Sequence, residues 1–345
     1  MPSRASMPDN NRLLDLLECR YPILQAGMGG VARAELVAAV AEAGAYGFLG
    51  VAGESAAGIA AEVDAVRAQT ERPFGINLVP AATDPALLDE ELAACAECGA
   101  HSICFFWDVD TDAIERARAA GCRVLYQVGS VEAAARAEAA GADAIIAQGV
   151  EAGGHVHGTL PTCVLVSHVV QAVSVPVVAS GGLVDGAGLV AAMALGASGV
   201  HCGTAFLATR EAFAHAYHKE RIVAAQSGDT VHTDAFAIGW PPQSPVRVLH
   251  NSVTRGLGDR LHGYGPDDHG REAIGEDAGE PVYRFGTESP LRTTVGELEA
   301  MALYAGEGAA LIDSIPTAGE RVRSMMASAE ECLEGLCGRT RIGAE

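Results

Sequence analysis

Residues 131–148 read VEAAARAEAAGADAIIAQ, an alanine-rich helical stretch that ends at Gly141 and passes at once into an apolar strand. The residue after a helix often needs a positive φ, which glycine adopts without a steric penalty, so the chain can turn directly into the strand. The same helix–glycine–strand pattern recurs four more times, with its glycine at Gly44, Gly99, Gly121 and Gly196. The sequence therefore predicts helices and strands that alternate closely.

Eight apolar stretches are predicted as strands, at residues 22–26, 46–51, 73–79, 102–107, 123–128, 143–148, 175–180 and 199–202. They are continuously apolar instead of alternating, as expected of parallel strands that are covered on both faces. Eight strand–helix units indicate an α/β fold, a closed TIM (β/α)8 barrel. An open doubly wound sheet is the alternative, but Gln25-Ala26-Gly27-Met28-Gly29-Gly30 lacks the GxGxxG spacing that would follow its first strand.

The strand–helix pattern stops after the eighth unit, which indicates a division of the chain. We expect the barrel over residues 1–209, a smaller and mainly helical substrate or lid domain over residues 210–316, and a C-terminal helix over residues 317–345 that packs back on the barrel. Inside the second unit, residues 263–279 are acidic and glycine-rich and predict a mobile loop, and residues 295–312 predict a returning helix.

Composition excludes several classes of partner. The formal net charge of -21 and the scattered arginines disfavour nucleic acid. No apolar run reaches the roughly 20 residues that span a bilayer, and residues 1–20 lack the apolar core of a signal peptide, so we expect a cytoplasmic protein. The nine cysteines are expected to be reduced, and the CxxC at Cys95 and Cys98 has no second pair at zinc spacing, so no metal is expected.

Barrels build their active sites at the carboxyl ends of the strands, so the residues there are candidates for function. After the first strand come Gly27, Met28 and Gly29, and the third, fifth and sixth strands contribute Asn77, Gln127 and Gln148. The seventh and eighth strands end in Ser180-Gly181-Gly182 and Gly203-Thr204. Glycines let backbone N–H groups approach an anion closely, and the loops after strands seven and eight commonly bind phosphate, so a phosphate site is predicted there. Turn glycines without a ligand are the alternative.

His155 follows Gly153 and Gly154 in the loop after the sixth strand. At that rim we expect it to face the pocket and to exchange protons near neutral pH. Glu151 and His201 are interpreted as supporting residues. A metal pair of His155 and His157 lacks a third ligand nearby.

These segments resemble the nitronate monooxygenases, formerly called 2-nitropropane dioxygenases, which are FMN-dependent α/β barrels. The resemblance spans nearly the whole chain and is carried by residues 22–29, 74–78, 148–155, 177–186 and 203–209, of which Glu151-Ala152-Gly153-Gly154-His155 is the most specific. It implies that Met28 and Asn77 line the flavin, that Gln127 and Gln148 contact its polar part, and that the glycine loops hold its phosphate. Residues 304–308 also resemble a family segment, which makes Tyr304 a candidate substrate contact. Some members carry lysine and aspartate where this chain has Gln127 and Gln148.

The resemblance implies a flavin-dependent oxidoreductase that converts alkyl nitronates and O2 to carbonyl compounds and nitrite, with His155 facing the flavin ring. If neutral nitroalkanes are also used, His155 is the candidate base. An FMN-dependent, NADH-using enoyl-ACP reductase of the same barrel family is the alternative, and a flavin- or phosphate-binding sensor without catalysis is a third. The physiological substrate and the oligomeric state stay open, with a homodimer as one option.

Overall fold

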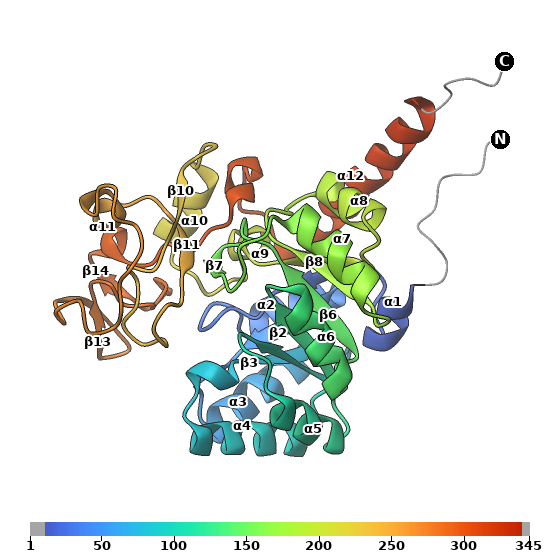
Figure 1. The fold of residues 1–345 in the computed structure, drawn as a ribbon, viewed down its shortest axis with the longest axis horizontal. Coiled ribbons are helices and arrows are strands. Elements are labelled where there is room, and N and C mark those ends of the chain that lie inside the picture. Colours follow the sequence, from blue (N-terminus) through green and yellow to red (C-terminus); the bar gives the residue numbers. More distant parts are fainter. Residues whose placement is uncertain (1–10, 340–345) are drawn as a thin grey trace.

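The computed structural model describes residues 11–339, and its centre is a closed parallel barrel (Figure 1). Its strands are β1 (Ile23–Gln25), β2 (Tyr46–Gly50), β3 (Gly75–Leu78), β4 (Ser102–Phe106), β5 (Arg123–Val128), β6 (Ala144–Gln148), β8 (Val177–Ser180) and β9 (Gly199–Cys202). They pair in that order, and β1 closes the barrel against β9 with Leu24 opposite His201. All eight strands expected from the sequence are confirmed.

Helices follow the strands and cover the barrel. They are α2 (Ala34–Glu42), α3 (Ala56–Arg67), α4 (Pro85–Glu97), α5 (Thr111–Ala119), α6 (Val131–Ala140), α7 (Thr162–Ala172), α8 (Gly186–Ala194) and the short α9 (Thr204–Leu207), with a 3-10 turn at Pro80–Ala82 after β3. All five glycines of the repeated helix–glycine–strand pattern have positive φ, from 61° at Gly99 to 107° at Gly141. The predicted helix stops are therefore confirmed, and the left-handed conformation explains the choice of glycine.

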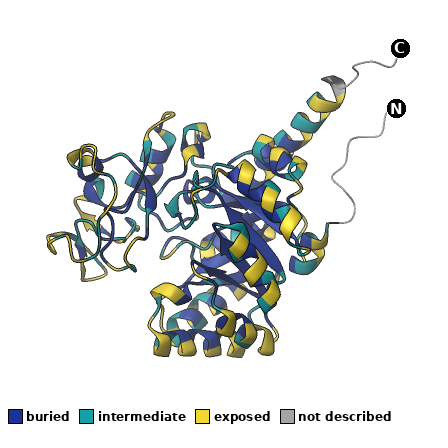
Figure 2. Cartoon of the chain, viewed as in Figure 1, coloured by how far each residue is buried: buried dark blue, intermediate teal, exposed yellow. Residues whose placement is uncertain are grey.

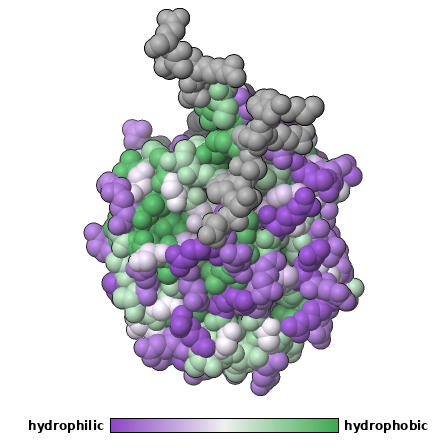
Figure 3. All heavy atoms as spheres, turned by 90° about the vertical axis from the view of Figure 1, so that its right-hand side faces the viewer, coloured by the Kyte–Doolittle hydropathy of each residue, from purple (hydrophilic) through white to green (hydrophobic). Residues whose placement is uncertain are grey.

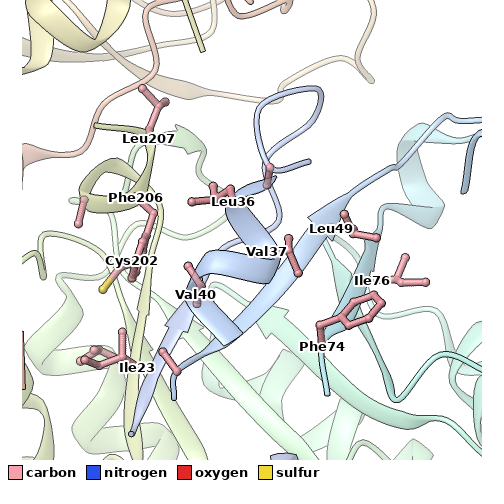
Figure 4. Packing of buried hydrophobic residues seen from close by; sticks show 14 of the residues in the cluster. Ile23, Leu36, Val37, Val40, Leu49, Phe74, Ile76, Cys202, Phe206 and Leu207 are labelled. Carbon is pink, nitrogen blue, oxygen red and sulfur yellow. The ribbon is translucent and has the colours of Figure 1, made fainter. Parts of the chain in front are cut away.

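The core has two layers, one inside the barrel and one between the strands and the helices. Buried residues concentrate on the strands and on the inner faces of the helices (Figure 2). Leu36, Val37 and Val40 of α2 pack beside Leu49 of β2 and Ile76 of β3 (Figure 4). Inside the barrel, inward-pointing strand residues form a separate cluster that also includes Leu13 and Leu17 of α1 (Arg12–Leu17), so this helix closes the amino end.

A second unit lies beside the carboxyl end of the barrel (Figure 1). It contains the helices α10 (Ala216–Val223) and α11 (Ser252–Gly256) and the strands β10 (Thr230–Thr233), β11 (Val246–Leu249), β12 (Ala273–Asp277), β13 (Glu280–Tyr283) and β14 (Val295–Gly296). The expectation of a mainly helical unit over residues 210–316 is therefore wrong, because two small antiparallel sheets, β10-β11-β7 and β13-β12-β14, share this region with short helices. The strand β7 (Gly154–His155) comes from the barrel segment.

The predicted returning helix over residues 295–312 is also wrong. Val295 and Gly296 pair with β12, and only two 3-10 turns follow, at Leu298–Ala300 and Glu307–Leu311. Gly296 has a φ of 131°, which a helix does not accept, and a Cβ at this position would lie 2.3 Å from the Ile274 carbonyl oxygen. Close strand pairing thus overrides the apolar spacing of this stretch. The expected loop over residues 263–279 contains β12, which occupies its last part.

The last helix, α12 (Ala318–Arg339), packs against the helices of the barrel. It packs on α8, where a Cβ at Gly186 would lie 2.1 Å from Ala329 N and where Ser328 Oγ accepts a hydrogen bond from Gly186 N at 2.8 Å. Figure 3 shows the face of the molecule around this helix, where hydrophilic and hydrophobic residues are mixed. No described helix has the length and apolarity needed to cross a bilayer.

The three domain boundaries stay a prediction. Residues 1–10 of the expected barrel domain and residues 340–345 of the expected C-terminal segment lie outside the described residues. Within the described part, β7 of the expected barrel domain pairs with β11 of the second unit, with Val246 opposite His155 and Arg247 opposite Gly154. The two units therefore share a sheet at the point where the chain carries His155.

Candidate active site

One cavity of about 570 Å³ opens at the carboxyl ends of the barrel strands and extends to the second unit. Every candidate site residue named from the sequence lines it. These are Gly27, Met28, Gly29, Asn77, Gln127, Gln148, Gly153, Gly154, His155, Ser180, Gly181, Gly182, Gly203, Thr204 and Tyr304. The sequence could identify these lining residues because the active site of a barrel lies at the carboxyl ends of its parallel strands, which bring the residues there together.

The ends of β8 and β9 form a glycine cradle, which we define as Ser180, Gly181, Gly182, Gly203 and Thr204. Gly181 and Gly182 have φ values of 114° and 71°, a conformation that other residues rarely adopt. The N–H groups of Gly182 and Gly203 have no hydrogen-bond acceptor among the described residues. Thr204 Oγ1 accepts a hydrogen bond from Gly306 N at 3.0 Å, which leaves the hydroxyl proton available to a ligand. The cradle thus presents donors without any cationic side chain.

His201 supports this cradle from inside the barrel. Its Nδ1 lies 3.2 Å from Ser180 Oγ, and the ring is buried against the edge of Phe48. Burial lowers the pKa of His201 to about 3, so the imidazole is neutral at physiological pH. This placement agrees with the supporting role expected for His201.

The opposite wall is built by tight backbone contacts between β1 and its neighbours. Asn77 Nδ2 donates a hydrogen bond to the Cys104 carbonyl at 3.0 Å, which fixes the side chain. A Cβ at Gly27 would lie 2.2 Å from Asn77 Cβ, and one at Gly50 would lie 2.2 Å from the Met28 carbonyl oxygen. Glycine is therefore required at position 27 for Asn77 to reach the cavity wall.

The two glutamines differ in what they bind. Gln148 Nε2 donates to the His155 carbonyl at 2.9 Å, and its Oε1 accepts from His157 N at 3.5 Å. Gln148 therefore fastens the loop that carries His155. Gln127 also lines the cavity, and its amide has no hydrogen-bond partner among the described residues, so it remains available to a ligand.

His155 is half-buried and its Nε2 is fully buried without a hydrogen-bond partner among the described residues. One face of the ring is covered by Trp240, with ring centroids 3.4 Å apart and planes 14° apart. Burial lowers the pKa of His155 to about 3. The expectation that His155 faces the pocket is confirmed, whereas the expected titration near neutral pH is wrong because desolvation keeps the imidazole uncharged.

The aromatic surroundings of His155 were not predicted. The chain has two tryptophans, Trp107 and Trp240, and both contact this histidine. Trp107 directly follows β4 and has a φ of 85°, a strained conformation for a bulky residue that typically costs about 1–3 kcal/mol. Trp107 could have been found from its position at the carboxyl end of a barrel strand. Trp240 lies in an irregular loop of the second unit, where the sequence has no comparable signal.

Tyr304 reaches the cavity from the second unit. Its ring centroid lies 5.8 Å from that of His155, and its hydroxyl donates to the Thr287 carbonyl at 2.7 Å. The following residues pack on the His155 loop, because a Cβ at Gly153 would lie 2.4 Å from Gly306 N. Glu151 closes the base of this loop and accepts hydrogen bonds from Thr162 N and Oγ1 at 2.9 and 2.8 Å, in agreement with its expected supporting role.

No group of three or more His, Cys, Asp or Glu side chains among residues 11–339 is arranged to hold a metal ion. His157 Nε2 instead lies 3.1 Å from Asp108 Oδ1, outside the cavity lining. The described cysteines are all free of disulfide bonds.

Known proteins share both the sequence and the barrel. A family model described as nitronate monooxygenase matches residues 10–101 and 88–328. A protein of Staphylococcus aureus (strain JH9) named "Probable nitronate monooxygenase" is 35% identical over 273 residues, which are 67% of this chain and 77% of that protein.

Two solved structures agree over nearly the full length. FabK from Thermotoga maritima is 32% identical with a TM-score of 0.82, over 96% of this chain and 100% of that one. A nitroalkane oxidase from Streptomyces ansochromogenes is 31% identical with a TM-score of 0.77, over 94% of this chain and 99% of that one. With a family model that covers most of the sequence and a relative of this identity, the chain belongs to the nitronate monooxygenase family.

Proposed function

We propose that this protein is an FMN-dependent nitronate monooxygenase that oxidises alkyl nitronates with O2 to carbonyl compounds and nitrite in the cytoplasm. The observation that carries the proposal is that the glycine cradle and His155 share one cavity of about 570 Å³. Membership of the family and the likeness to a nitroalkane oxidase support the same chemistry.

The residues of the cavity fit FMN. The volume of the cavity, about 570 Å³, falls in the range of about 300–1,000 Å³ that is common for small-molecule sites. A Cβ at Gly203 would meet nothing closer than 3.8 Å, and one at Gly154 would meet nothing within 4 Å, so both glycines leave room for a ligand. The free N–H groups and the Thr204 hydroxyl would hold the phosphate, and Met28, Asn77 and Gln127 would line the flavin. Bound FMN supplies redox chemistry toward the nitronate and O2.

His155 acts in this proposal as a neutral hydrogen-bond donor. A nitronate arrives already anionic, so no base is needed, and an imidazole N–H can stabilise charge on its oxygens. Trp240 covers one ring face and excludes water there, which strengthens this interaction because the local dielectric is low. Neutral nitroalkanes require a base whose pKa lies near the working pH, and the His155 pKa of about 3 is far from it. Preformed nitronates are therefore the preferred substrates.

The test combines flavin identification with two activity assays. The purified protein should release FMN on denaturation, and addition of ethyl nitronate should cause O2 uptake and nitrite release. The second assay measures NADH oxidation driven by an enoyl thioester. Oxidation of NADH in that assay, together with no response to any nitronate, would replace the proposed function by the enoyl reductase alternative.

The role of His155 is tested by substitution. We expect His155→Ala to lower kcat/KM for ethyl nitronate by about 100-fold, the usual loss for one donor to a developing charge, and His155→Asn to lower it less because an amide still donates. The pH profile of the wild type should show no inflection from this imidazole near its ordinary pKa of about 6.5. His157→Asn is the matched control, since His157 lies two residues away and outside the cavity lining. Equal rates in all variants would remove His155 from the mechanism.

A further inference from the structure

The part of the cavity near His155 is largely apolar and aromatic. It is formed where the barrel meets the second unit, and its walls include Val79, Phe106, Trp240, Val282, Leu291 and Met301. Val79, Phe106 and Trp240 belong to one cluster with Trp107, so this wall is continuous. Such a surface favours an uncharged organic group, because burial of apolar area is favourable at about 25 cal/mol per Å².

None of the described residues that line the cavity is lysine or arginine. The nearby arginines are engaged elsewhere. Arg33 Nε donates to the Gly30 carbonyl at 2.9 Å, and its guanidinium lies 3.8 Å from the centroid of the Phe213 ring. Arg247 Nε donates to the Val150 carbonyl at 3.0 Å, and its NH1 lies 3.1 Å from Glu307 Oε1. The cavity therefore offers no cation to a second anionic group on a ligand.

Two carboxylates line the cavity instead, those of Asp277 and Glu288. Glu288 directly follows Thr287, whose carbonyl accepts the Tyr304 hydroxyl, so it lies at the His155 end. Burial raises the pKa of Tyr304 above its ordinary range, and the negative charge of Glu288 adds to that rise. Burial also raises the pKa of Glu288, which has no cationic partner within the described residues. Asp277 Oδ1 accepts from Thr293 Oγ1 at 2.6 Å and Thr294 Oγ1 at 3.1 Å, so its charge is partly dispersed.

We propose that this enzyme selects nitronates whose organic part is neutral and apolar, aromatic groups included, and that Glu288 discriminates against nitronates with a second negative charge. This inference rests on the proposed nitronate oxidation. A carboxylate on the substrate would lose hydration in the apolar part of the cavity and gain no cationic partner there. It would also meet Glu288, and like charges brought together in an interface disfavour binding. The net charge of -21 opposes the approach of a dianion as well.

The first experiment compares two substrates on the wild-type enzyme loaded with FMN. Propyl 1-nitronate and propionate 3-nitronate differ only in a methyl group in place of a carboxylate. We expect kcat/KM to be at least about 10-fold higher for propyl 1-nitronate, and the nitronate of phenylnitromethane to be accepted. Equal values, or a preference for propionate 3-nitronate, would overturn the inference while nitronate oxidation stands. If none of the three is oxidised, the proposed function itself fails.

The second experiment assigns the discrimination to Glu288. We expect Glu288→Gln to raise the ratio of kcat/KM for propionate 3-nitronate over propyl 1-nitronate by about 5- to 10-fold, and Glu288→Lys to raise it further. Glu280→Gln is the matched control, because Glu280 is exposed on β13 of the same unit and does not line the cavity. An equal ratio in Glu288→Gln and Glu280→Gln would show that Glu288 is not the discriminating group. The comparison on the wild type remains decisive if a variant fails to fold.

Discussion

Gly203→Ala places one methyl group inside the glycine cradle without disturbing the fold around it. Gly203 has a φ of -94°, which alanine adopts without strain. A Cβ at this position would lie 3.8 Å from Ala26 Cβ and 3.8 Å from Met28 Sδ, both ordinary contacts with residues that line the cavity. The substitution therefore changes the space open to a phosphate and little else.

The expected loss of FMN affinity follows from the hydrogen bonds that the methyl group displaces. A hydrogen bond to a charged group contributes about 1.5–3 kcal/mol, so losing one of them weakens binding by about 10- to 150-fold. The apoprotein should not lose stability, and a gain of about 0.4–1 kcal/mol is expected because alanine restricts the unfolded chain. Affinity and stability are thus predicted to change in opposite directions.

The assay is a titration of apoprotein with FMN, followed by quenching of flavin fluorescence, together with thermal unfolding of the apoprotein. Gly335→Ala is the matched control, because Gly335 lies in α12, has no atom within 4 Å of an added Cβ and does not line the cavity. It should stabilise the helix and leave the FMN dissociation constant unchanged. An unchanged dissociation constant in Gly203→Ala would refute the assignment of the cradle to phosphate, and a destabilised apoprotein would refute the claim that the added methyl group makes only ordinary contacts.

Two further substitutions test the loops that frame the cavity. Glu91 is buried, and its Oε1 accepts from Gly53 N at 2.6 Å in the loop after β2. Burial raises the pKa of Glu91 from 4.5, its value in the unfolded chain, to about 7 in the folded protein. The stability that this carboxyl group contributes is therefore fully present below pH 4.5 and is lost as the pH rises through about 7. Glu91→Gln should therefore become more stable than the wild type as the pH rises between these two pKa values, by on the order of 2 kcal/mol. Thermal unfolding of both proteins at several pH values tests this, and a stability difference that stayed constant with pH would contradict it. Gly153→Ala forces a Cβ to within 2.4 Å of Gly306 N, so it should destabilise the protein by about 1–3 kcal/mol and lower nitronate turnover, whereas Gly270→Ala, which meets nothing within 4 Å, should do neither.

The barrel could be predicted from the sequence because its signals are local. Each of the five repeated glycines ends a helix through its own backbone conformation, and each apolar run is long enough to identify a buried strand without knowledge of its partner. The second unit could not be predicted in this way. Val295 and Gly296 become a strand only because β12 lies beside them, and that pairing is invisible in a sequence with an apolar spacing that also suits a helix.

The residues of the candidate site likewise differ in whether a local sequence signal marks them. Residues at the carboxyl ends of barrel strands, such as Asn77 within β3 and Gly203 directly after β9, were found by position alone. Trp240 and Glu288 reach the cavity from the second unit through contacts between distant segments, and nothing local marks them. The pKa of His155 was missed for a related reason, since the two residues before it are glycines and the Trp240 indole that covers it lies 85 positions further along the chain.

The shared sheet couples the position of His155 to the second unit, whereas the N–H groups of the glycine cradle are carried by the barrel segment. The cradle follows β8 and β9, which pair with each other in the barrel, and it touches the second unit where Gly306 N donates a hydrogen bond to Thr204 Oγ1. His155 lies on β7, which pairs with β11, and Arg247 of β11 reaches back to the Val150 carbonyl before this strand. A change in the sheet β10-β11-β7 can therefore alter the walls around His155, or the position of β7 itself, while the N–H groups of Gly182 and Gly203 remain on the barrel segment. The neutral Gln148 fits this arrangement, because both ends of its amide hold the His155 loop by hydrogen bonds, whereas an aspartate at this position could only accept them.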